Sequence, residues 1–398
     1  MSRTPDAIVV GGGLIGCLAA RALADDGRRV TVFERGAELG RKASTAAAGM
    51  LSPQMEWAED LLVEGAHDLA RRTDAMLDLG IAARGRWPAF AAALEAETGR
   101  RLHYRDEGTL VVALTDVEAA ELEARARTQR RRGLRAEWLE PGRVQDLEPG
   151  ISGGAVGALY IPDDRQVDPL PLMAAAGEAL AARAGVRIET GMTVRAILSA
   201  GGRVRGVAIE GGSAGEGGTA EAELVVLAAG AWSAGVAGLP RPLAVRPVKG
   251  QMAALRPAAM PIRHVVGGRG AYCVPRDDGR IVVGATVEDA GFDERVDPAA
   301  VEALIRAAAA AVPALAAAPV ESRWSGLRPG TGDDLPILGE DPELAGLLYA
   351  TGHYRNGILL APLTAEIVAA LARGENPPVD TTPFSPVRAG LEEPASRQ

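Results

Sequence analysis

Cysteine, histidine and aromatic residues are scarce in this sequence of 398 residues. The two cysteines, Cys17 and Cys273, lie far apart in apolar stretches, and the four histidines show no zinc-ligand spacing. These patterns exclude a disulfide framework and a structural metal site, and we expect no metal at the functional site. Aromatic residues make up only 4% of the chain, which argues against base stacking, whereas 49 glycines favour close backbone packing around a ligand.

Basic charge and long hydrophobic runs are also limited. Lys plus Arg number 43 against 52 for Asp plus Glu, a net charge of −9, so the phosphate backbone of a nucleic acid would be repelled. The uncharged stretch 7–20 contains three consecutive glycines and is shorter than the roughly 20 residues of a membrane span. We expect a cytoplasmic protein with no nucleic-acid or membrane partner.

The chain length predicts two domains, at roughly 100 to 200 residues per domain. At the N-terminus, residues 7–10 (AIVV) predict a buried strand, residues 14–24 a helix, and residues 30–33 (VTVF) a second strand ending at Glu34. A strand, turn, helix and strand in about thirty residues form a right-handed parallel crossover.

Helical and strand patterns alternate along the rest of the chain. Residues 211–218 (GGSAGEGG) predict a flexible loop and residues 377–398 a loosely ordered tail. Helices are predicted within 60–97 and at 116–132, 169–184, 298–311 and 357–372, and strands at 109–114, 186–188, 194–198, 204–209, 224–227 and 347–350, and near Val245, Val265, Tyr272 and Ile281.

The strongest local motif is G-x-G-x-x-G at residues 11–16, directly between the first strand and the first helix. Gly11 suits a tight turn, Gly13 a close approach to a pyrophosphate at the helix N-terminus, and Gly16 close packing of helix on strand. Glu34 follows Gly16 by 18 residues, close to the roughly 20 expected for an acid that binds ribose hydroxyls. The motif predicts dinucleotide binding but leaves FAD and NAD open.

Two later segments resemble further parts of such a site. Residues 224–232 (LVVLAAGAW) form a strand with a small-residue turn, which suggests a doubly wound sheet interrupted by an insertion, although a plain core strand fits as well. Residues 352–358 (GHYRNGI) form a polar turn before the last helix, whose N-terminal N–H groups suit the negative edge of a reduced flavin. The alternative is an ordinary helix capped by Asn356.

Three stretches carry a family resemblance that covers nearly the whole chain: residues 44–51 (STAAAGML), 326–331 (GLRPGT) and 352–362 (GHYRNGILLAP). With them the sequence resembles the FAD-dependent D-amino-acid oxidase family and, within it, the glycine oxidases. The resemblance implies noncovalent FAD and oxidative deamination of glycine or small amines such as sarcosine and D-alanine. It implies hydride transfer to flavin N5, an imine that yields glyoxylate and ammonia, and H2O2 from O2. It also implies a homo-oligomer that serves the thiazole branch of thiamine biosynthesis.

The same resemblance assigns the substrate site. Arg328 matches the arginine that binds the substrate carboxylate, for which a planar guanidinium is the natural bidentate partner. Tyr272 matches a tyrosine hydroxyl, Arg355 lies beside the flavin, and Met50 lies in the first of the three stretches. A structural role for Arg328 and core packing for Tyr272 are the alternatives. We find no obvious general base, and hydride transfer requires only a neutral amine and good alignment.

Two positions depart from the family pattern by loss of bulk. Gly270 replaces a frequent histidine and Val287 a frequent methionine, which suggests a roomier substrate pocket. The motifs and the resemblance assign the cofactor contacts to Gly11, Gly13, Leu14, Ile15, Gly16, Glu34, Arg35, Ser44, Thr45, Ala48, Gly49, Met50, Val194, Ala229, Gly230, Trp232, His353, Tyr354, Arg355, Asn356, Gly357 and Ile358.

We therefore expect an α/β fold with a discontinuous Rossmann-type FAD-binding domain and a substrate domain of β-sheet and helices, as in D-amino-acid oxidase. The boundaries are 1–84, 141–230 and 327–375 for the first, 85–140 and 231–326 for the second, and 376–398 for the tail. Two other functions stay open. One is a D-amino-acid or sarcosine dehydrogenase or oxidase with an acceptor other than O2, and the other is a non-catalytic flavin-binding interaction module.

Overall fold

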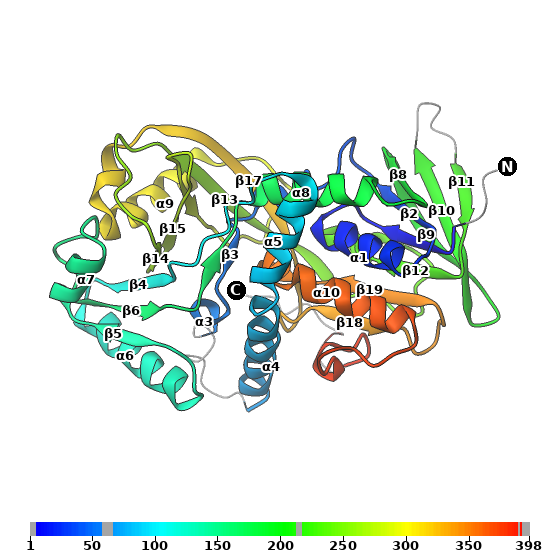
Figure 1. Ribbon diagram of the computed structural model, residues 1–398, viewed down its shortest axis with the longest axis horizontal. Helices are drawn as coiled ribbons and strands as arrows, with labels where there is room; N and C mark the ends of the chain where they lie inside the picture. Colours follow the sequence, from blue (N-terminus) through cyan, green and yellow to red (C-terminus); the bar gives the residue numbers. More distant parts are fainter. Residues whose placement is uncertain (1–4, 58–66, 212–216, 389–390, 392–398) are drawn as a thin grey trace.

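The computed structural model describes residues 5–57, 67–211, 217–388 and 391 (Figure 1). A six-stranded and an eight-stranded sheet form the centres of two bodies that lie side by side, with α4 (His67–Arg84) and α5 (Trp87–Thr98) drawn between them in Figure 1. This α/β architecture confirms the fold class expected from the sequence.

The six-stranded sheet contains the predicted N-terminal crossover. The strand β1 (Ala7–Val10) pairs in parallel with β2 (Val30–Glu34), and α1 (Leu14–Asp25) connects them. On its other side β1 pairs in parallel with β12 (Leu224–Leu227), far away in sequence. The full strand order is β18 (Ile337–Glu340), β19 (Leu347–Thr351), β12, β1, β2 and β8 (Val186–Thr190).

The two faces of this sheet are covered differently. Val9 belongs to a core shared with α1, α4, α5, α8 (Pro169–Ala181) and α10 (Gly357–Ala372). Ile8 and Val10 point to the opposite face, because side chains alternate along a strand, and pack with the antiparallel sheet of β9 (Met192–Ala200), β10 (Arg203–Gly211) and β11 (Gly217–Glu221). The expectation of a doubly wound sheet is corrected here, since a second sheet covers this face.

The eight-stranded sheet presents one face to the first body. Its opposite face packs on α9 (Pro298–Ala311) through residues such as Cys273 and Leu304, while α6 (Asp116–Arg131) covers a separate part. Met252, Val274 and Tyr272 share a cluster with Ala48 of the first body. The strand order is β17 (Val320–Thr331), β13 (Val245–Leu255), β16 (Ile281–Gly284), β15 (Ala271–Pro275), β14 (Val265–Gly268), β4 (Thr109–Ala113), β6 (Gly157–Ile161) and β5 (Glu137–Leu139).

The domain boundaries expected from the sequence need four corrections. The boundary between 326 and 327 divides β17, whose last residues therefore belong to the eight-stranded sheet and not to the FAD domain. Helix α5, within the 85–140 segment assigned to the substrate domain, buries Trp87 and Leu94 in the core of the first body. Strand β6, within the 141–230 segment assigned to the FAD domain, belongs to the eight-stranded sheet. The tail is packed in its described part, because Phe384 is 2% exposed and Arg388 pairs with Asp333 at 2.7 Å.

Short elements complete the connections. Of the predicted 211–218 loop, residues 212–216 lie outside the described residues, and Gly217 begins β11. The short connecting elements are α2 (Ala43–Ala46), β3 (Met50–Leu51), α3 (Pro53–Glu56), α7 (Pro141–Leu147), β7 (Arg165–Gln166), η1 (Gly230–Gly235), η2 (Pro313–Ala317), η3 (Tyr354–Asn356) and η4 (Thr382–Phe384).

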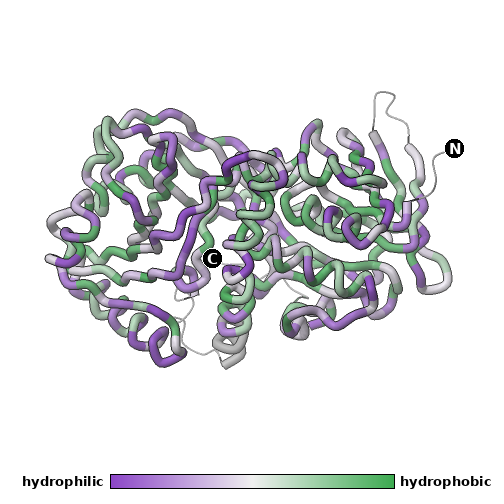
Figure 2. The backbone as a smooth tube through the Cα atoms, in the orientation of Figure 1, coloured by the Kyte–Doolittle hydropathy of each residue, from purple (hydrophilic) through white to green (hydrophobic). Residues whose placement is uncertain are grey.

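Helix α10 is the most apolar helix of the first body. The stretch Tyr354–Ala372 is long and apolar enough to cross a membrane, yet 67% of it is buried inside the protein. It packs against α1 and α4, and Figure 2 shows it in hydrophobic green, whereas α6 is mostly hydrophilic purple. Its hydrophobicity is accounted for by its central place in the core.

Candidate active site

A cavity of about 480 Å³ lies between the two bodies. The first body contributes the carboxyl ends of β1, β2, β12 and β19, which is where ligands bind in open α/β sheets. The eight-stranded sheet contributes Tyr272 and Arg328. Nearly all residues predicted for the site line this cavity, and the exceptions are Gly16, Thr45 and Asn356.

The glycine-rich turn has the predicted geometry. Gly11 has φ +107°, and a Cβ added there would lie 2.4 Å from the carbonyl oxygen of Ala228. A Cβ on Gly16 would lie 1.9 Å from the carbonyl oxygen of Gly11, so Gly16 acts in packing helix on strand and does not reach the cavity. Gly13 is the N-cap residue of α1 and offers no side-chain cap. The turn leaves a cradle of backbone N–H groups that a larger residue would fill.

Glu34 is held at the end of β2 by the backbone. Its carboxylate accepts hydrogen bonds from the Gly12 N–H at 2.8 Å and the Gly36 N–H at 2.6 Å. The side chain is half-buried and lines the cavity. A carboxylate fixed in this place can accept hydrogen bonds from ribose hydroxyls, as the motif spacing predicted.

The segment 44–50 forms another wall of the cavity. The Leu14 N–H, in the first turn of α1, donates to Ser44 Oγ at 2.9 Å, which ties this segment to the glycine-rich turn. Thr45 instead donates its hydroxyl to the Gly40 carbonyl at 2.9 Å and lies outside the cavity lining, so its cofactor contact stays a prediction. Met50 lines the cavity from β3.

The N-terminus of α10 opens onto the cavity through Gly357 and Ile358. Asn356 is the N-cap residue, but its side chain makes no capping hydrogen bond and does not line the cavity. Asn356 thus occupies the cap position that the alternative predicted, without a side-chain cap, and its cofactor contact stays a prediction. The helix presents backbone N–H groups and a partial positive charge to this wall.

Arg328 and Tyr272 lie on the inner face of the eight-stranded sheet, each over a glycine. A Cβ on Gly250 would lie 2.3 Å from Arg328 Nη2, and a Cβ on Gly284 would lie 2.6 Å from the Tyr272 hydroxyl. Burial raises the pKa of Tyr272, while the Arg328 charge nearby opposes that rise. Arg328 thus offers a cation, and Tyr272 a protonated hydroxyl, to a ligand in the cavity.

Further charged groups act on the same hydroxyl. Glu56 of α3 and Arg355 of η3 both line the cavity, and their charges influence the pKa of Tyr272 after that of Arg328. Met55, next to Glu56, also lines the cavity and would contact a Cβ on Gly267. Sequence reasoning missed Met55 and Glu56, because a four-residue helix gives no periodic signal.

Sequence reasoning also missed Arg276, which directly follows β15. It is 5% exposed and donates to the carbonyl oxygens of Ala48 at 2.5 Å and Val167 at 3.2 Å. It therefore joins the eight-stranded sheet to the segment that walls the cavity. What marks Arg276 is its burial at the end of a strand. The local sequence pattern does not show whether a single arginine is buried, so this residue could not be predicted.

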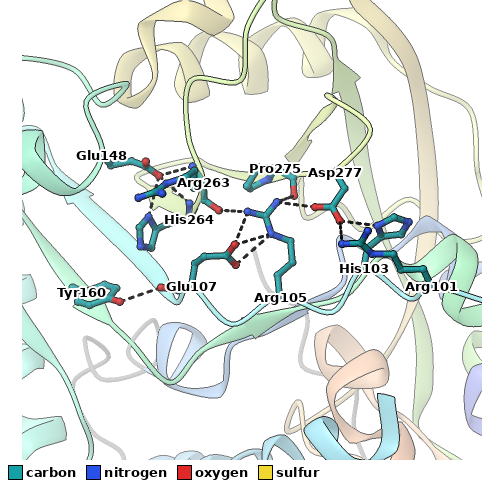
Figure 3. A network of polar contacts seen from close by, with 10 residues as sticks. All are labelled: Arg101, His103, Arg105, Glu107, Glu148, Tyr160, Arg263, His264, Pro275 and Asp277. Carbon is teal, nitrogen blue, oxygen red and sulfur yellow. Dashed lines mark hydrogen bonds and ion pairs between the residues drawn. The ribbon is translucent and has the colours of Figure 1, made fainter. Parts of the chain in front are cut away.

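Each of the three histidines whose side chains the structure describes is held by a polar partner within the protein. His353 lines the cavity but is 3% exposed and contacts Thr364 Oγ1 at 3.0 Å, and burial lowers its pKa to about 3. Figure 3 shows His264 beside Glu148 and His103 beside Asp277, in a polar network that lies outside the cavity lining. The side chain of His67 lies outside the described residues. These placements fit a reaction without a histidine base.

The Arg105 network in Figure 3 has a structural explanation. Arg105 donates to Glu107 at 2.8 Å and to the Arg263 carbonyl at 2.9 Å, and the Tyr160 hydroxyl donates to the Glu107 carbonyl at 3.0 Å. These contacts join the segment before β4 to its neighbours β14 and β6.

Comparisons with known proteins agree with this geometry. The family model described as DAO, FAD dependent oxidoreductase, matches residues 6–371. The chain belongs to this family. This chain is 38% identical over 393 residues to a glycine oxidase of Geobacillus kaustophilus, with 98% of each chain covered. The crystal structure of glycine oxidase from Geobacillus kaustophilus superposes with a TM-score of 0.85 at 36% identity, covering 97% of this chain and 99% of that one.

A bifunctional relative is about twice as long as this chain, which matches 52% of its length. The chain is 37% identical to the bifunctional protein ThiO/ThiG of Trichormus variabilis, covering 92% of this chain and 52% of that protein. The family assignment confirms the predicted resemblance, the FAD cofactor and the class of FAD-dependent amine oxidoreductases. The residues fit FAD, because the glycine cradle, the Glu34 carboxylate and the open end of α10 all line one cavity.

Proposed function

We propose that this protein is a glycine oxidase, which converts glycine and related small amines to the imine and then to glyoxylate and ammonia. The observation that carries this proposal is that the Arg328 guanidinium and the Tyr272 hydroxyl lie together on one wall of the cavity. The body that contains the glycine-rich turn forms the other wall. The names of the relatives, glycine oxidase and ThiO/ThiG, support the reaction and its link to thiamine biosynthesis.

The chain's own residues bind and align the substrate. Arg328 holds the carboxylate as a bidentate partner, and Tyr272 donates its hydroxyl hydrogen to the same group. Bound FAD supplies the acceptor for the two electrons and the hydrogen that leave the substrate Cα. None of the three histidines whose side chains the structure describes is placed to act as base, so the substrate amine enters in its neutral form and the protein contributes alignment and electrostatics.

Two positions in the cavity lining carry smaller residues than the family pattern. Gly270 and Val287 both line it, and Val287 is 53% exposed. We propose that sarcosine, N-ethylglycine and D-alanine are accepted beside glycine. O2 as acceptor, a homo-oligomeric state and a cytoplasmic location stay predictions of the sequence.

Anaerobic mixing of the purified protein with glycine, sarcosine or D-alanine tests the reaction. We expect each amine to bleach the flavin absorbance, and glyoxylate to form from glycine. A flavin that none of the amines bleaches would favour the non-catalytic binding module. Admission of air separates the two acceptors, since steady H2O2 production supports the oxidase and bleaching without H2O2 supports a dehydrogenase.

A further inference from the structure

A cluster of four polar residues lies directly behind Arg328: Lys249, Gln251, Thr286 and Glu288. None of the four lines the cavity. We propose that Thr286, Glu288 and Gln251 are positioning residues, which fix Arg328 in the orientation that binds a carboxylate. This inference rests on the proposed role of Arg328 as the carboxylate anchor.

The first step is the set of groups that hold Arg328. Its Nη1 donates to the Thr286 carbonyl at 3.1 Å and to the Lys249 carbonyl at 3.4 Å. Below it, the missing Cβ of Gly250 leaves room for the guanidinium, since that Cβ would lie 2.3 to 2.5 Å from its atoms. The position of the cation therefore depends on where the backbone of Thr286 lies.

The second step is the way Thr286 is held. Its Oγ1 accepts the Gln251 N–H at 2.8 Å and donates to a carboxylate oxygen of Glu288. Its own N–H donates to the Gln251 carbonyl at 3.3 Å. The neighbours Ala285 and Val287 line the cavity while Thr286 does not, so the hydroxyl lies on the cluster side of this segment.

The third step is the satisfaction of the cluster itself. Gln251 is fully buried, donates from Nε2 to Glu288 Oε1 at 2.7 Å, and accepts the Asp297 N–H on Oε1 at 2.6 Å. Lys249 is 5% exposed, and its Nζ lies 3.6 Å from Glu288 Oε2. Burial favours the neutral acid, but the hydrogen bonds from Thr286 and Gln251 and the Lys249 charge lower the pKa of Glu288. The carboxylate is therefore charged at neutral pH.

Such a cluster fixes geometry more than it adds stability. A buried ion pair gains little over apolar packing, but a fully satisfied polar network specifies one arrangement of the backbone around it. Here that arrangement decides where the Thr286 carbonyl meets Arg328. The cluster should thus affect carboxylate binding selectively, whereas a purely structural cluster would affect every substrate and the flavin alike.

Paired variants of the holoenzyme separate these outcomes. Thr286→Val removes the hydroxyl at equal size and Thr286→Ser retains it, while Glu288→Gln removes the charge. Asp289→Asn is the matched control, because Asp289 is the exposed neighbouring acid outside the cluster. The measurements are acetate binding, followed by flavin absorbance, and KM and kcat for glycine and for ethylamine, an amine without a carboxylate.

We expect Thr286→Val and Glu288→Gln to weaken acetate binding and raise KM for glycine roughly tenfold, the scale of a displaced positioning group. Turnover of ethylamine, flavin content, Thr286→Ser and Asp289→Asn should stay within twofold of wild type, about the scatter of surface changes. Equal losses for glycine and ethylamine, or unchanged acetate binding in both variants, would overturn the inference.

Arg328→Ala serves as the reference in the same assays. If it weakens acetate binding while the cluster variants do not, the positioning role alone is wrong. If Arg328→Ala binds acetate like wild type, the anchor role is wrong and the positioning role is overturned with it.

Discussion

At the scale of single residues, Arg328 should control substrate binding most strongly. It lies half-buried over Gly250, where a bound carboxylate would cover it further, and removing one partner of a desolvated charge pair costs about 3 to 5 kcal/mol. Arg328→Ala should therefore lower kcat/KM for glycine by roughly two to four orders of magnitude without loss of flavin. Tyr272→Phe should cost about 1 kcal/mol, as for one neutral hydrogen bond.

An amine without a carboxylate is the control for Arg328. Its poor turnover should be nearly equal in wild type and Arg328→Ala, because the anchor has nothing to hold. Glycine oxidation by Arg328→Ala within a few-fold of wild type, or equal loss for both amines, would show that the anchor role is wrong. Arg355, which also lines the cavity, would then be the residue to test.

Glu34 should determine how tightly the adenosine ribose is held. Glu34→Ala removes the acceptor that the Gly12 and Gly36 N–H groups now fix, and FAD binding should weaken by about 1.5 to 3 kcal/mol. Titration of apoprotein with FAD measures this loss. The control Glu38→Ala removes an exposed carboxylate paired with Arg41 and should bind FAD normally. Equal FAD affinity in Glu34→Ala and wild type would count against the assignment.

His353 gives a pH dependence whose sign follows from its buried state. Its pKa is lowered from 6.5 to about 3, so between these values the unfolded chain binds more protons and stability falls as pH falls. At pH 5 the loss is about 2 kcal/mol, and at pH 7.5 it is close to zero. Urea unfolding at both pH values should show a smaller acid loss in His353→Gln than in wild type. Parallel losses in the two proteins would contradict this origin.

At the scale of elements, clear end signals gave correct bounds. The helices α9 and α10 begin and end as the sequence predicted, since Asp297 with Pro298 marks the first and Gly357 follows a polar turn in the second. The strands β6 and β17 were harder to predict from the sequence. Neither the partner of a short apolar run nor the sheet to which it belongs is written in its local pattern, so β6 was assigned to the wrong domain.

The residues of the site likewise fall into those that the sequence predicted and those that it did not. Motif glycines, Glu34 and Arg328 were predictable because their chemistry requires those residue types at those places. The cluster behind Arg328 was not, because Gln251 and Glu288 are 37 positions apart and only the pairing of strands brings them together. Thr45 and Asn356 were assigned from neighbouring motif residues, and the direction of a side chain in a short turn does not follow from its place in a motif.

Arg276 tests how the elements around the cavity are joined. Arg276→Met keeps much of the side chain's length but leaves the Ala48 and Val167 carbonyls unpaired, with Asp168 also deprived of a cation 4.0 Å away. The free energy of unfolding should fall by about 3 kcal/mol, and FAD should dissociate faster because segment 44–50 loses its support. Arg295→Met, at an exposed arginine, is the control. Wild-type stability in Arg276→Met would rule out this joining role.

At the scale of the whole molecule, the two bodies meet around the cavity, and neither cysteine faces it. Cys17 is buried in the helical core and donates to the Gly12 carbonyl at 3.4 Å, and Cys273 points to the α9 side of its sheet. Burial raises the pKa of both thiols to about 12, so neither is a ready nucleophile. Neither cysteine is therefore placed to attach a flavin, and we expect the cofactor to be held by noncovalent contacts from both bodies and to stabilise them together.

Release and rebinding of FAD test this arrangement. Acid precipitation should leave the yellow colour in the supernatant, as it does for free FAD mixed with albumin as a control. Colour in the pellet would show a covalent link and contradict the prediction. Apoprotein prepared by dialysis against potassium bromide should regain FAD, and at a thousandfold excess over Kd the gain of about 4 kcal/mol should raise Tm by about 5 °C. Because the cavity is walled by both sheets, one unfolding transition should move as a unit; two transitions, of which FAD shifts only one, would show that the cofactor binds one body alone.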